Sequence, residues 1–424
     1  MAAPTLSSVS PNQGPSSGGA TVTLTGTGFT GATAVRFGTT AGASFTVTSS
    51  TQIIAVTPPG TGAVNVTVTT SQGTSAQTVT YTYAAVPSIT SLAPTQGPTT
   101  GGTTVTITGT NLTGATAVRF DATAATSFTV NSPTQITAVT PAHAAGAAAV
   151  TVTTPGGTSN SQTFTYVTAP VLSSLAPTQG PTAGGTTVTL TGTSLTGATA
   201  VRFDATAATS FTVNSPTQIT AVTPAHVAGA AAVTVTTPGG TSNPDSPPAY
   251  FFYAAPPSAT DIAPSSGTVA GGTTVILTGS GFINATAVRF DATAATSFTV
   301  NSPTQITAVT PAHAAGAAAV TVTTPGGTSN ALAYTYLAAP ILTSLTPNQG
   351  PASGGNVIAL TGTNLTTTTS VLFGGTPVAF TVLSPTQVTA LTPAGAAGAV
   401  TVTVATAAGV SNGLTYTRIA GPAI

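Results

Sequence analysis

The sequence predicts an all-β protein of five tandem β-sandwich domains, which we expect to form an elongated rod. Three observations lead to this prediction. The chain has 424 residues and repeats itself five times at an interval of about 83 residues. Short polar–apolar alternations of period two run through each repeat, and no stretch has the 3.6-residue period of a helix. Clusters of glycine and proline separate these segments, which is typical of short strands joined by turns.

The three inner repeats share an identical segment of 29 residues, at positions 115–143, 198–226 and 285–313. Equivalent arginines lie 83 residues apart until residues 243–248 insert a small loop and lengthen one interval to 87. A fixed period of this kind marks a tandem array in which each repeat is one structural unit. We therefore place the domains at residues 1–85, 86–168, 169–255, 256–338 and 339–424.

Within repeat 1, Val22 and Leu24 alternate with threonine, so they fall on one face of a strand. The other alternating segments are rich in valine and threonine, as strands usually are. The predicted strands cover residues 21–25, 34–37, 45–47, 52–56, 64–69 and 79–83. Residues 12–15, 18–19 and 57–60 are interpreted as turns between them. About seven short strands in some 83 residues indicate a β-sandwich.

The predicted linkers are short, at residues 84–87, 167–170 and 337–340, and each contains proline and small residues. Such joints limit bending. This is the basis for expecting a rod or a gently curved string of domains.

The repeats resemble the IPT/TIG domain, an immunoglobulin-like family. In repeat 1 the family pattern reads Pro11-Asn12-Gln13-Gly14-Pro15, Gly18-Gly19, a strand from Thr21 to Gly26, Gly28-Phe29 and Val35-Arg36-Phe37-Gly38. Repeat 5 carries it at residues 347–375, whereas repeat 4 departs from it at residues 264–268, and repeats 2 to 4 have aspartate in place of the last glycine. The resemblance covers essentially the whole chain. It implies an immunoglobulin-like sandwich and leaves the function open, because the family includes receptors, transcription factors, accessory domains of enzymes and bacterial surface arrays.

The composition excludes several classes of function. Charged residues make up 2% of the chain, with five Arg, five Asp and a formal net charge of zero. Nucleic-acid binding requires several basic contacts to phosphate, so we do not expect it. Threonine, glycine or proline breaks every apolar run well before the 20 or so residues of a membrane span, so no membrane insertion is expected. A polar surface with so little charge repulsion makes self-association easier than usual.

The chain contains no cysteine, which removes disulfides, thiolate chemistry and cysteine-based zinc sites. No acidic cluster suggests calcium, and no paired carboxylates suggest glycoside hydrolysis. We therefore expect neither a cofactor nor an enzyme. The first residues run into repeat 1 without a basic and apolar leader, so the export route stays open.

Nine residues are candidate partner contacts, because they are nearly the only ionisable groups of the inner repeats. They are Arg119, Asp121, His143, Arg202, Asp204, His226, Arg289, Asp291 and His313. Each Arg-x-Asp pair is interpreted as lying on one strand face with the intervening Phe turned to the core. The simplest interpretation is a surface ion pair worth about 0–1 kcal/mol, and the alternative is a repeated polar spot that docks a partner.

The histidines follow Thr-Pro-Ala in equivalent loops, and the sequence shows no nearby carboxylate or cysteine. We interpret each as a loop histidine that faces solvent or a neighbouring molecule. The end repeats differ, since repeat 1 has Gly38 and Pro59, and repeat 5 has Leu372 and Gly395, in place of these groups. The inner trio therefore lies between two atypical end units, as is common in repeat arrays.

The leading functional hypothesis is a non-enzymatic structural or adhesive protein of an extracellular or particle surface. It would serve as a spacer or as a self-assembling filament component, with other copies of itself, a surface protein or a glycan as partners and a homo-oligomer as a possible state. Two alternatives stay open: an array of carbohydrate-binding modules, and a surface or fibre component of a phage or contractile-injection particle. The first alternative requires exposed aromatic residues, and most Phe and Tyr lie at core positions of their strands.

Overall fold

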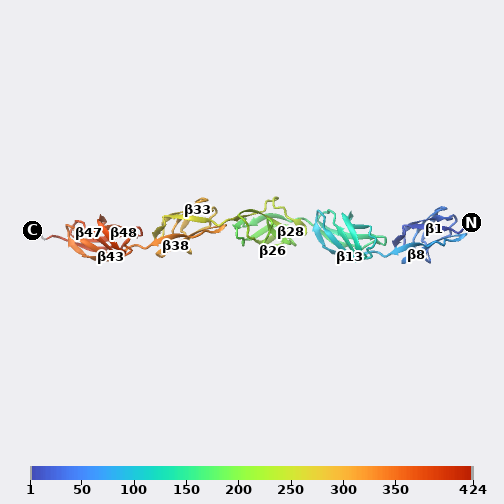
Figure 1. The fold of residues 1–424 in the computed structure, drawn as a ribbon, viewed down its shortest axis with the longest axis horizontal. Helices are drawn as coiled ribbons and strands as arrows, with labels where there is room; N and C mark the ends of the chain where they lie inside the picture. Colours follow the sequence, from blue (N-terminus) through green and yellow to red (C-terminus); the bar gives the residue numbers. More distant parts are fainter. Residues whose placement is uncertain (1, 422–424) are drawn as a thin grey trace. The chain divides into compact units, whose positions relative to one another are not determined.

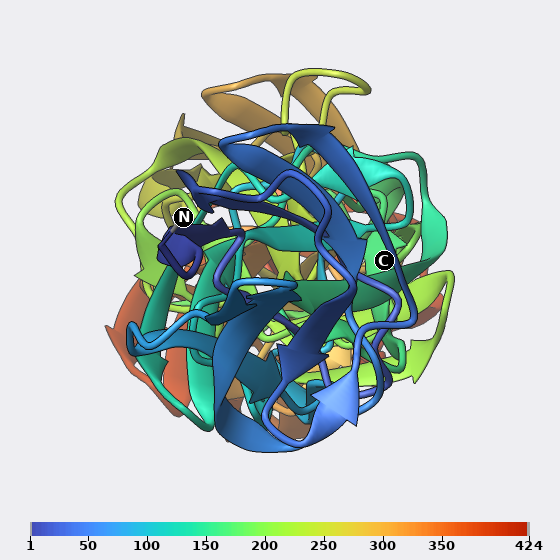
Figure 2. The same cartoon turned by 90° about the vertical axis from the view of Figure 1, so that its right-hand side faces the viewer.

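The computed structural model describes residues 2–421, and in this part of the chain the regular elements are all β-strands (Figures 1 and 2). Repeats 1 and 2 lie within one compact unit and repeats 4 and 5 within a second, while repeat 3 contributes residues to both. In each repeat the strands form one four-stranded and one six-stranded sheet. The all-β prediction and the pairing of two sheets per repeat are confirmed.

Repeat 2 illustrates the topology. Its four-stranded sheet has the order β11 (Ser88–Ala93), β13 (Thr104–Thr110), β17 (Gln135–Val139) and β16 (Ser127–Ser132). Its six-stranded sheet has the order β12 (Gln96–Pro98), β20 (Gln162–Val167), β18 (Gly146–Thr154), β14 (Ala117–Phe120) and β15 (Thr123–Ala124), with β19 (Gly157–Thr158) paired to β18. Apart from the parallel pair β12–β20, the ladders are antiparallel.

The period-two pattern explains the core of each sandwich. In β13, Val105 and Ile107 are fully buried between the sheets while the alternating threonines face outward. Phe120, Phe164 and Tyr166 join them in one cluster, and equivalent clusters fill repeats 1, 4 and 5. Each of these repeats therefore has its own hydrophobic core.

Strand bounds in repeat 1 match the expectation closely: β4 is Ala34–Phe37 and β7 is Gln52–Val56, as predicted. The prediction of a turn at residues 12–15 is wrong, because Gln13–Pro15 forms β2, which pairs in parallel with β10 (Val79–Ala84). The physical reason is Gly14. The hydroxyl of Tyr81 lies where a side chain at this position would stand, so only glycine allows β2 to approach the last strand.

A side-chain amide completes the first strand of most repeats. In β11 the pairing register shifts between Ile89 and Ser91, which leaves the backbone of Ile89 to find another partner. Asn160 supplies it: Ile89 N–H donates to Asn160 Oδ1 (2.9 Å), and Asn160 Nδ2 donates to the Ile89 carbonyl (3.0 Å). Asn330 and Asn412 make the same two bonds in repeats 4 and 5.

We expect Asn160→Ala to weaken repeat 2 by about 1–3 kcal/mol, because it leaves the buried Ile89 N–H without an acceptor. The Ile89 carbonyl keeps a hydrogen bond from Gln162 Nε2, so the backbone N–H of Ile89 is the group that loses its partner. Hydrogen exchange in the full chain would show faster exchange at Ile89, whereas the exposed Ser161→Ala control would not. An Ile89 amide that stays equally protected in Asn160→Ala would contradict this role.

Candidate functional site

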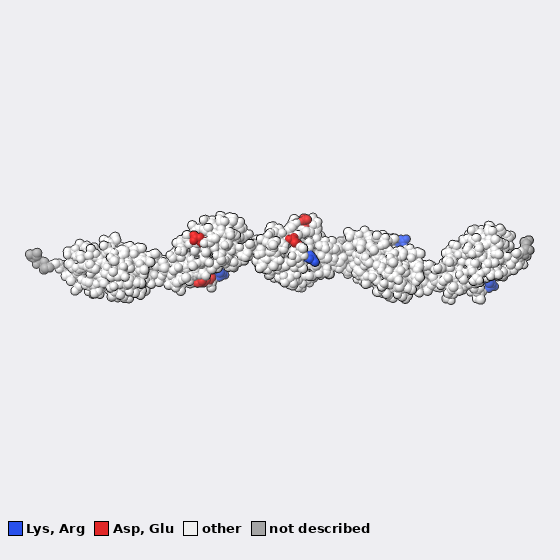
Figure 3. All heavy atoms as spheres, viewed as in Figure 1, with Lys and Arg blue, Asp and Glu red and all other residues white. Residues whose placement is uncertain are grey.

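Figure 3 shows how sparse the charges are on one face of the molecule. Four arginines lie near the end of a strand of the six-stranded sheet, and in the inner repeats an aspartate occupies the turn that follows this strand. Asp121 follows the last residue of β14 and has a φ of 50°, in the left-handed region. The expectation that it shares a strand face with Arg119 is therefore wrong. Repeats 1 and 5 have Gly38 (φ 61°) and Gly374 (φ 59°) at this turn, and aspartate is one of the few other residues that tolerate it.

The Asp121 carboxylate joins two segments far apart in sequence. Its Oδ1 accepts a hydrogen bond from Ala149 N–H (2.8 Å), and its Oδ2 lies 3.2 Å from Nε2 of His143. Asp291 makes the same contacts to Ala319 and His313 in repeat 4, at 2.8 and 3.2 Å. The expectation that no carboxylate lies near these histidines is wrong, because the fold brings together a strand end and a loop that are 22 residues apart.

Four of the five arginines cap the turn beside them. Arg119 Nη1 donates to the carbonyl of Ala122 at 2.7 Å, and Arg36, Arg202 and Arg289 make the equivalent bond at 2.7–2.8 Å. In the described residues of repeats 2 and 4, the arginine makes no ion pair with the aspartate two positions on. The predicted Arg–Asp surface pair is thus wrong there, since the left-handed turn directs the carboxylate to the neighbouring strand and to the histidine.

The histidine rings are packed against tyrosine. His143 stacks on Tyr166 with ring centroids 4.8 Å apart and an interplanar angle of 21°, and its Nδ1 lies 2.9 Å from the Ala144 carbonyl. His226 on Tyr253 and His313 on Tyr336 repeat the stack at 4.8 Å. The side chain of His143 is 21% exposed, so the ring faces the tyrosine more than the solvent, and a contact with a neighbouring molecule stays a prediction. A broad aromatic surface at the edge of the core attracts the ring.

The end repeats fill the same place differently. Gly60 N–H donates to Ser16 O, as His143 N–H donates to Thr99 O and Gly395 N–H to Ala352 O, each at 2.9 Å. Gly60, not Pro59, is therefore the counterpart of the histidine. With no side chain there, Tyr83 lies directly over Gly60, and in repeat 5 the Arg418 guanidinium lies over Gly395. An Arg in place of the tyrosine makes repeat 5 the most divergent at this point.

Burial is the main cause of the raised pKa of the tyrosines on which His143 and His313 stack. It raises the pKa of Tyr166, and the nearby Asp121 carboxylate raises it further. Burial, followed by Tyr334 and Asp291, raises the pKa of Tyr336 to about 12. Both phenols are at most 1% exposed, so they serve as packing groups that stay neutral at physiological pH.

The arrangement offers little for catalysis. Within residues 2–421, no three His, Cys, Asp or Glu side chains gather to hold a metal ion. A search of the same residues finds no helix with the length and apolar character to cross a membrane. In the His143–Asp121 pair, the aspartate accepts a hydrogen bond from a backbone N–H, the histidine Nδ1 lies beside a backbone carbonyl, and the imidazole ring stacks on Tyr166. This pair stabilises a loop and holds no nucleophile.

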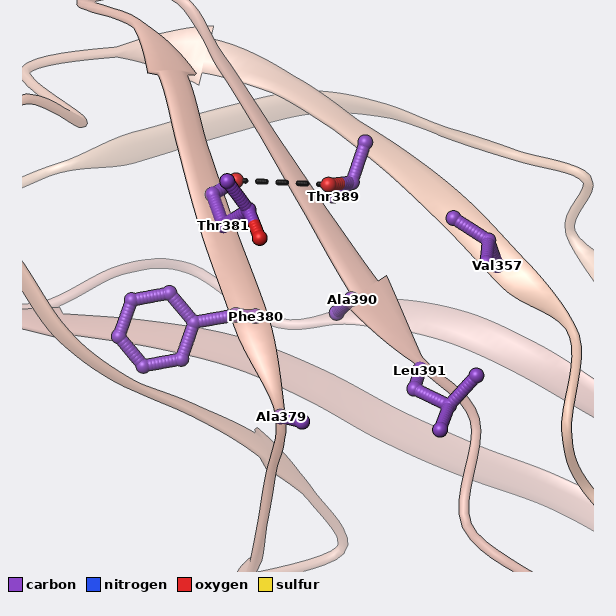
Figure 4. A pocket seen from close by; sticks show the side chains of 7 residues that line it. All are labelled: Val357, Ala379, Phe380, Thr381, Thr389, Ala390 and Leu391. Carbon is purple, nitrogen blue, oxygen red and sulfur yellow. Dashed lines mark hydrogen bonds between the residues drawn. The ribbon is translucent and has the colours of Figure 1, made fainter.

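Two surfaces outside this pair are unusual. A shallow hollow on the four-stranded sheet of repeat 5 exposes Val357 (64%) and Leu391, which are cross-strand partners on β43 (Val357–Thr363) and β47 (Gln387–Leu391) (Figure 4). The second is Phe252 in repeat 3. Of the 15 Phe and 8 Tyr of the chain, all within the described residues, Phe252 alone is exposed (55%).

The sequence already held a signal for Phe252. The last strand of repeat 3 reads Tyr250-Phe251-Phe252-Tyr253, whereas repeat 2 has Thr163-Phe164-Thr165-Tyr166 at the same place. Two threonines of the outward face are thus replaced by aromatic residues. Because Phe252 alternates with Phe251 and Tyr253, which match the core residues of repeat 2, its position in the strand predicts an outward side chain.

The model of the IPT/TIG domain matches the sequence five times, at residues 4–83, 87–166, 170–250, 257–336 and 340–417. The chain belongs to the IPT/TIG domain family. The matched segments together cover far more than half of the chain and follow the five repeats described above. A search of curated proteins found no match.

Several solved structures resemble this IPT/TIG chain at low identity. The extracellular region of plexin A4 is 19% identical with a TM-score of 0.31, over 96% of this chain and 43% of the plexin. Invasin, a bacterial integrin-binding protein, is 17% identical with a TM-score of 0.26, over 78% and 79% of the two chains. SGBP-B from a xyloglucan utilization locus of Bacteroides uniformis is 19% identical with a TM-score of 0.20, over 46% and 56%. The chain spans less than half the length of the plexin, and these values assign it no function.

Substitutions of Asp121 would separate its two contacts. Asp121→Asn keeps the left-handed turn and the acceptor for Ala149 but removes the charge, so we expect a loss of at most about 1 kcal/mol. Asp121→Ala loses the acceptor and strains the turn, so we expect about 1–3 kcal/mol. Calorimetry of the full chain with hydrogen exchange at Ala149 measures both, and equal losses for Asn and Ala would contradict the capping role.

Alkaline pH should destabilise repeat 4 through Tyr336. An unfolded tyrosine ionises near pH 10, whereas folded Tyr336 holds its proton to about pH 12. The stabilising contribution is therefore complete below pH 10 and is lost as the pH rises through 12. Thermal unfolding against pH should fall over this window, and less steeply in Tyr336→Phe. Phenolate absorbance from Tyr336 near pH 10 in the folded chain would contradict the assignment.

Proposed function

We propose that the chain is a non-enzymatic structural protein of an extracellular or particle surface, whose repeats associate with other copies through open strand edges. The observation that carries this proposal is the last strand of each four-stranded sheet. The edge strands are β6 (Ser44–Ser49), β16 (Ser127–Ser132), β26 (Ser210–Ser215), β36 (Ser297–Ser302) and β46 (Phe380–Ser384).

Each edge strand pairs with a neighbour on one side only within the described sheets, so half of its backbone groups face outward. Natural proteins commonly block such edges with charged side chains, and none of these five strands carries a charge. A bulge between Val130 and Ser132 limits the regular edge of β16 to its first four residues. These four residues keep the outward backbone groups to which we expect a strand of a second molecule to add.

Repetition strengthens the argument. The inner three edge strands have the same sequence, Ser-Phe-Thr-Val-Asn-Ser, and recur at the spacing of the repeats. Weak edge contacts of equal kind add up when one chain carries several of them. The near absence of charge removes the long-range repulsion that would otherwise keep copies apart.

The titratable groups support a structural role over catalysis. Asp121 and Asp291 cap a backbone amide, Arg119 and Arg289 cap a backbone carbonyl, and the histidines beside them stack on tyrosine. A general base needs a substrate group within reach and freedom to exchange a proton with it. Groups already held by backbone and ring contacts serve the fold instead.

Charge placed on the edge strands should abolish association. The variant Thr129→Lys/Thr212→Lys/Thr299→Lys puts one lysine on each inner edge strand. The control Thr104→Lys/Thr187→Lys/Thr274→Lys adds the same charge at exposed positions of the second strand of the same sheets. Electron microscopy and sedimentation velocity over rising concentration should show ordered assemblies of the wild type and the control, and monomers of the edge variant.

Two outcomes would contradict the proposal. Dispersed wild-type monomers at every concentration would exclude assembly and leave a tethered spacer. Equal inhibition by the edge variant and the control would show that added charge, not edge pairing, governs association.

A further inference from the structure

Repeat 3 differs from the other repeats on the outer face of its last strand, β30 (Tyr250–Ala254). Phe251 and Tyr253 point into the core, so Tyr250 and Phe252 share the opposite, outward face. The residues at these two positions elsewhere are small: Thr80 and Thr82, Thr163 and Thr165, Ala333 and Thr335, and Thr415 and Thr417. Only the third repeat therefore carries two aromatic side chains on this face.

The two strands beside Phe252 carry no charged side chain. On one side β22 (Gln179–Pro181) runs parallel to β30, with Gln179 as the register partner of Phe252, and Phe252 N–H donates to Thr178 O at 2.8 Å. On the other side lies β28 (Gly229–Thr237), whose first residues, Gly229 and Ala230, are exposed and small. The Phe252 ring therefore has small residues on one side and the Gln179 side chain on the other.

The size of this surface decides between two classes of occupant. An aromatic side chain buries about 150–250 Å² when fully covered, so the open part of Phe252 and the half-buried Tyr250 offer on the order of 100–200 Å². A stable contact between two proteins buries about 1,200–2,000 Å² in total. The patch is far too small to hold a second copy by itself, and its size suits one or two rings of a small ligand.

The chemistry narrows the ligand further. No charged residue lies on β22 or β30, and the Asp204 carboxylate at the neighbouring strand β28 is held by the Ala232 N–H (2.8 Å), so these two strands offer an ionic ligand no counter-charge. The faces of the aromatic rings carry partial negative charge and attract C–H bonds polarised by neighbouring oxygens. The Gln179 amide offers both a donor and an acceptor at the edge of the rings. A neutral, flat, hydroxyl-rich molecule satisfies all three conditions.

We propose that Tyr250 and Phe252 form a binding platform for a neutral polysaccharide, with a sugar ring stacked on Phe252 and its hydroxyls hydrogen-bonded by Gln179. The site belongs to repeat 3 alone and acts as a single anchor within the array. It goes beyond the proposed association through strand edges and does not require it, because the two surfaces lie on different sheets of the sandwich.

The test uses the full chain and the double variant Tyr250→Thr/Phe252→Thr, which gives β30 the outward residues of repeats 1, 2 and 5 and should therefore fold. Frontal affinity chromatography on columns that carry immobilised hydroxyethylcellulose, barley mixed-linkage glucan or galactomannan provides the probes, because this method does not depend on the charge of the chain. The wild type should be retarded by at least one of them. The variant should show a dissociation constant at least about tenfold higher, with unchanged circular dichroism.

A gain-of-function variant serves as the matched partner. Thr163→Tyr/Thr165→Phe builds the same pair in repeat 2, where Gln96 is the register partner of Thr165, and should increase the retardation. The edge-strand lysine variant should be retarded like the wild type, which separates this site from the assembly proposal.

Three results would overturn the platform. One is a wild type that none of the three polysaccharides retards. Another is equal retardation of the wild type and the Tyr250→Thr/Phe252→Thr variant. The third is a variant that loses self-association in sedimentation but keeps its retardation, which would make the patch a contact between copies.

Discussion

In repeats 1, 2 and 4, aromatic rings of the last strand pack against one another and against a phenylalanine of the same six-stranded sheet, and these rings form part of the core. In repeat 1 Tyr81 meets Phe37 and Tyr83 edge to face, with ring centroids 5.4 and 5.0 Å apart, and repeats 2 and 4 pack equivalent rings in the same way. Three other features depend on these rings. The glycine of the second short strand makes room for the inner ring, the histidine stacks on the outer one, and the aromatic pair of repeat 3 stands on the reverse of the same strand. The outward face of this strand is therefore backed by side chains that are buried in the core.

In the inner repeats the arginine and the first aspartate of each copy form contacts within their own turn and with the segments beside it. A turn that needs a left-handed residue is occupied by glycine in the end repeats and by aspartate in the inner ones. The aspartate adds a backbone cap and a histidine contact, which glycine cannot supply. The arginine beside it closes the same turn from the other side. Because these groups already have partners, the outer surface is left to threonine, serine, asparagine and glutamine.

Most of the fold could be predicted from the sequence, because period-two alternation and glycine–proline turns act over a few residues. Val22 and Leu24 alternate with threonine, and this pattern alone predicts a strand with both apolar side chains on its buried face. Contacts between distant segments could not be predicted in this way. Asp121 and His143 meet only because a strand end and a loop close on one another, and β2 forms only because the Tyr81 ring lies over a glycine. The exposed Phe252 could be predicted from the sequence, since its place in the alternation of the strand puts it on the side opposite to the buried Phe251 and Tyr253.

The near absence of surface charge has a consequence for the medium in which the protein works. Simple salts act on proteins mainly by screening charges, and this chain gives them almost nothing to screen. Its contacts instead depend on hydrogen bonds and apolar burial, which respond to temperature and to salts that are excluded from protein surfaces, such as sulfate. Association between such molecules should hold in dilute and in saline surroundings alike. A chain of this composition is thus suited to places where ionic strength varies widely.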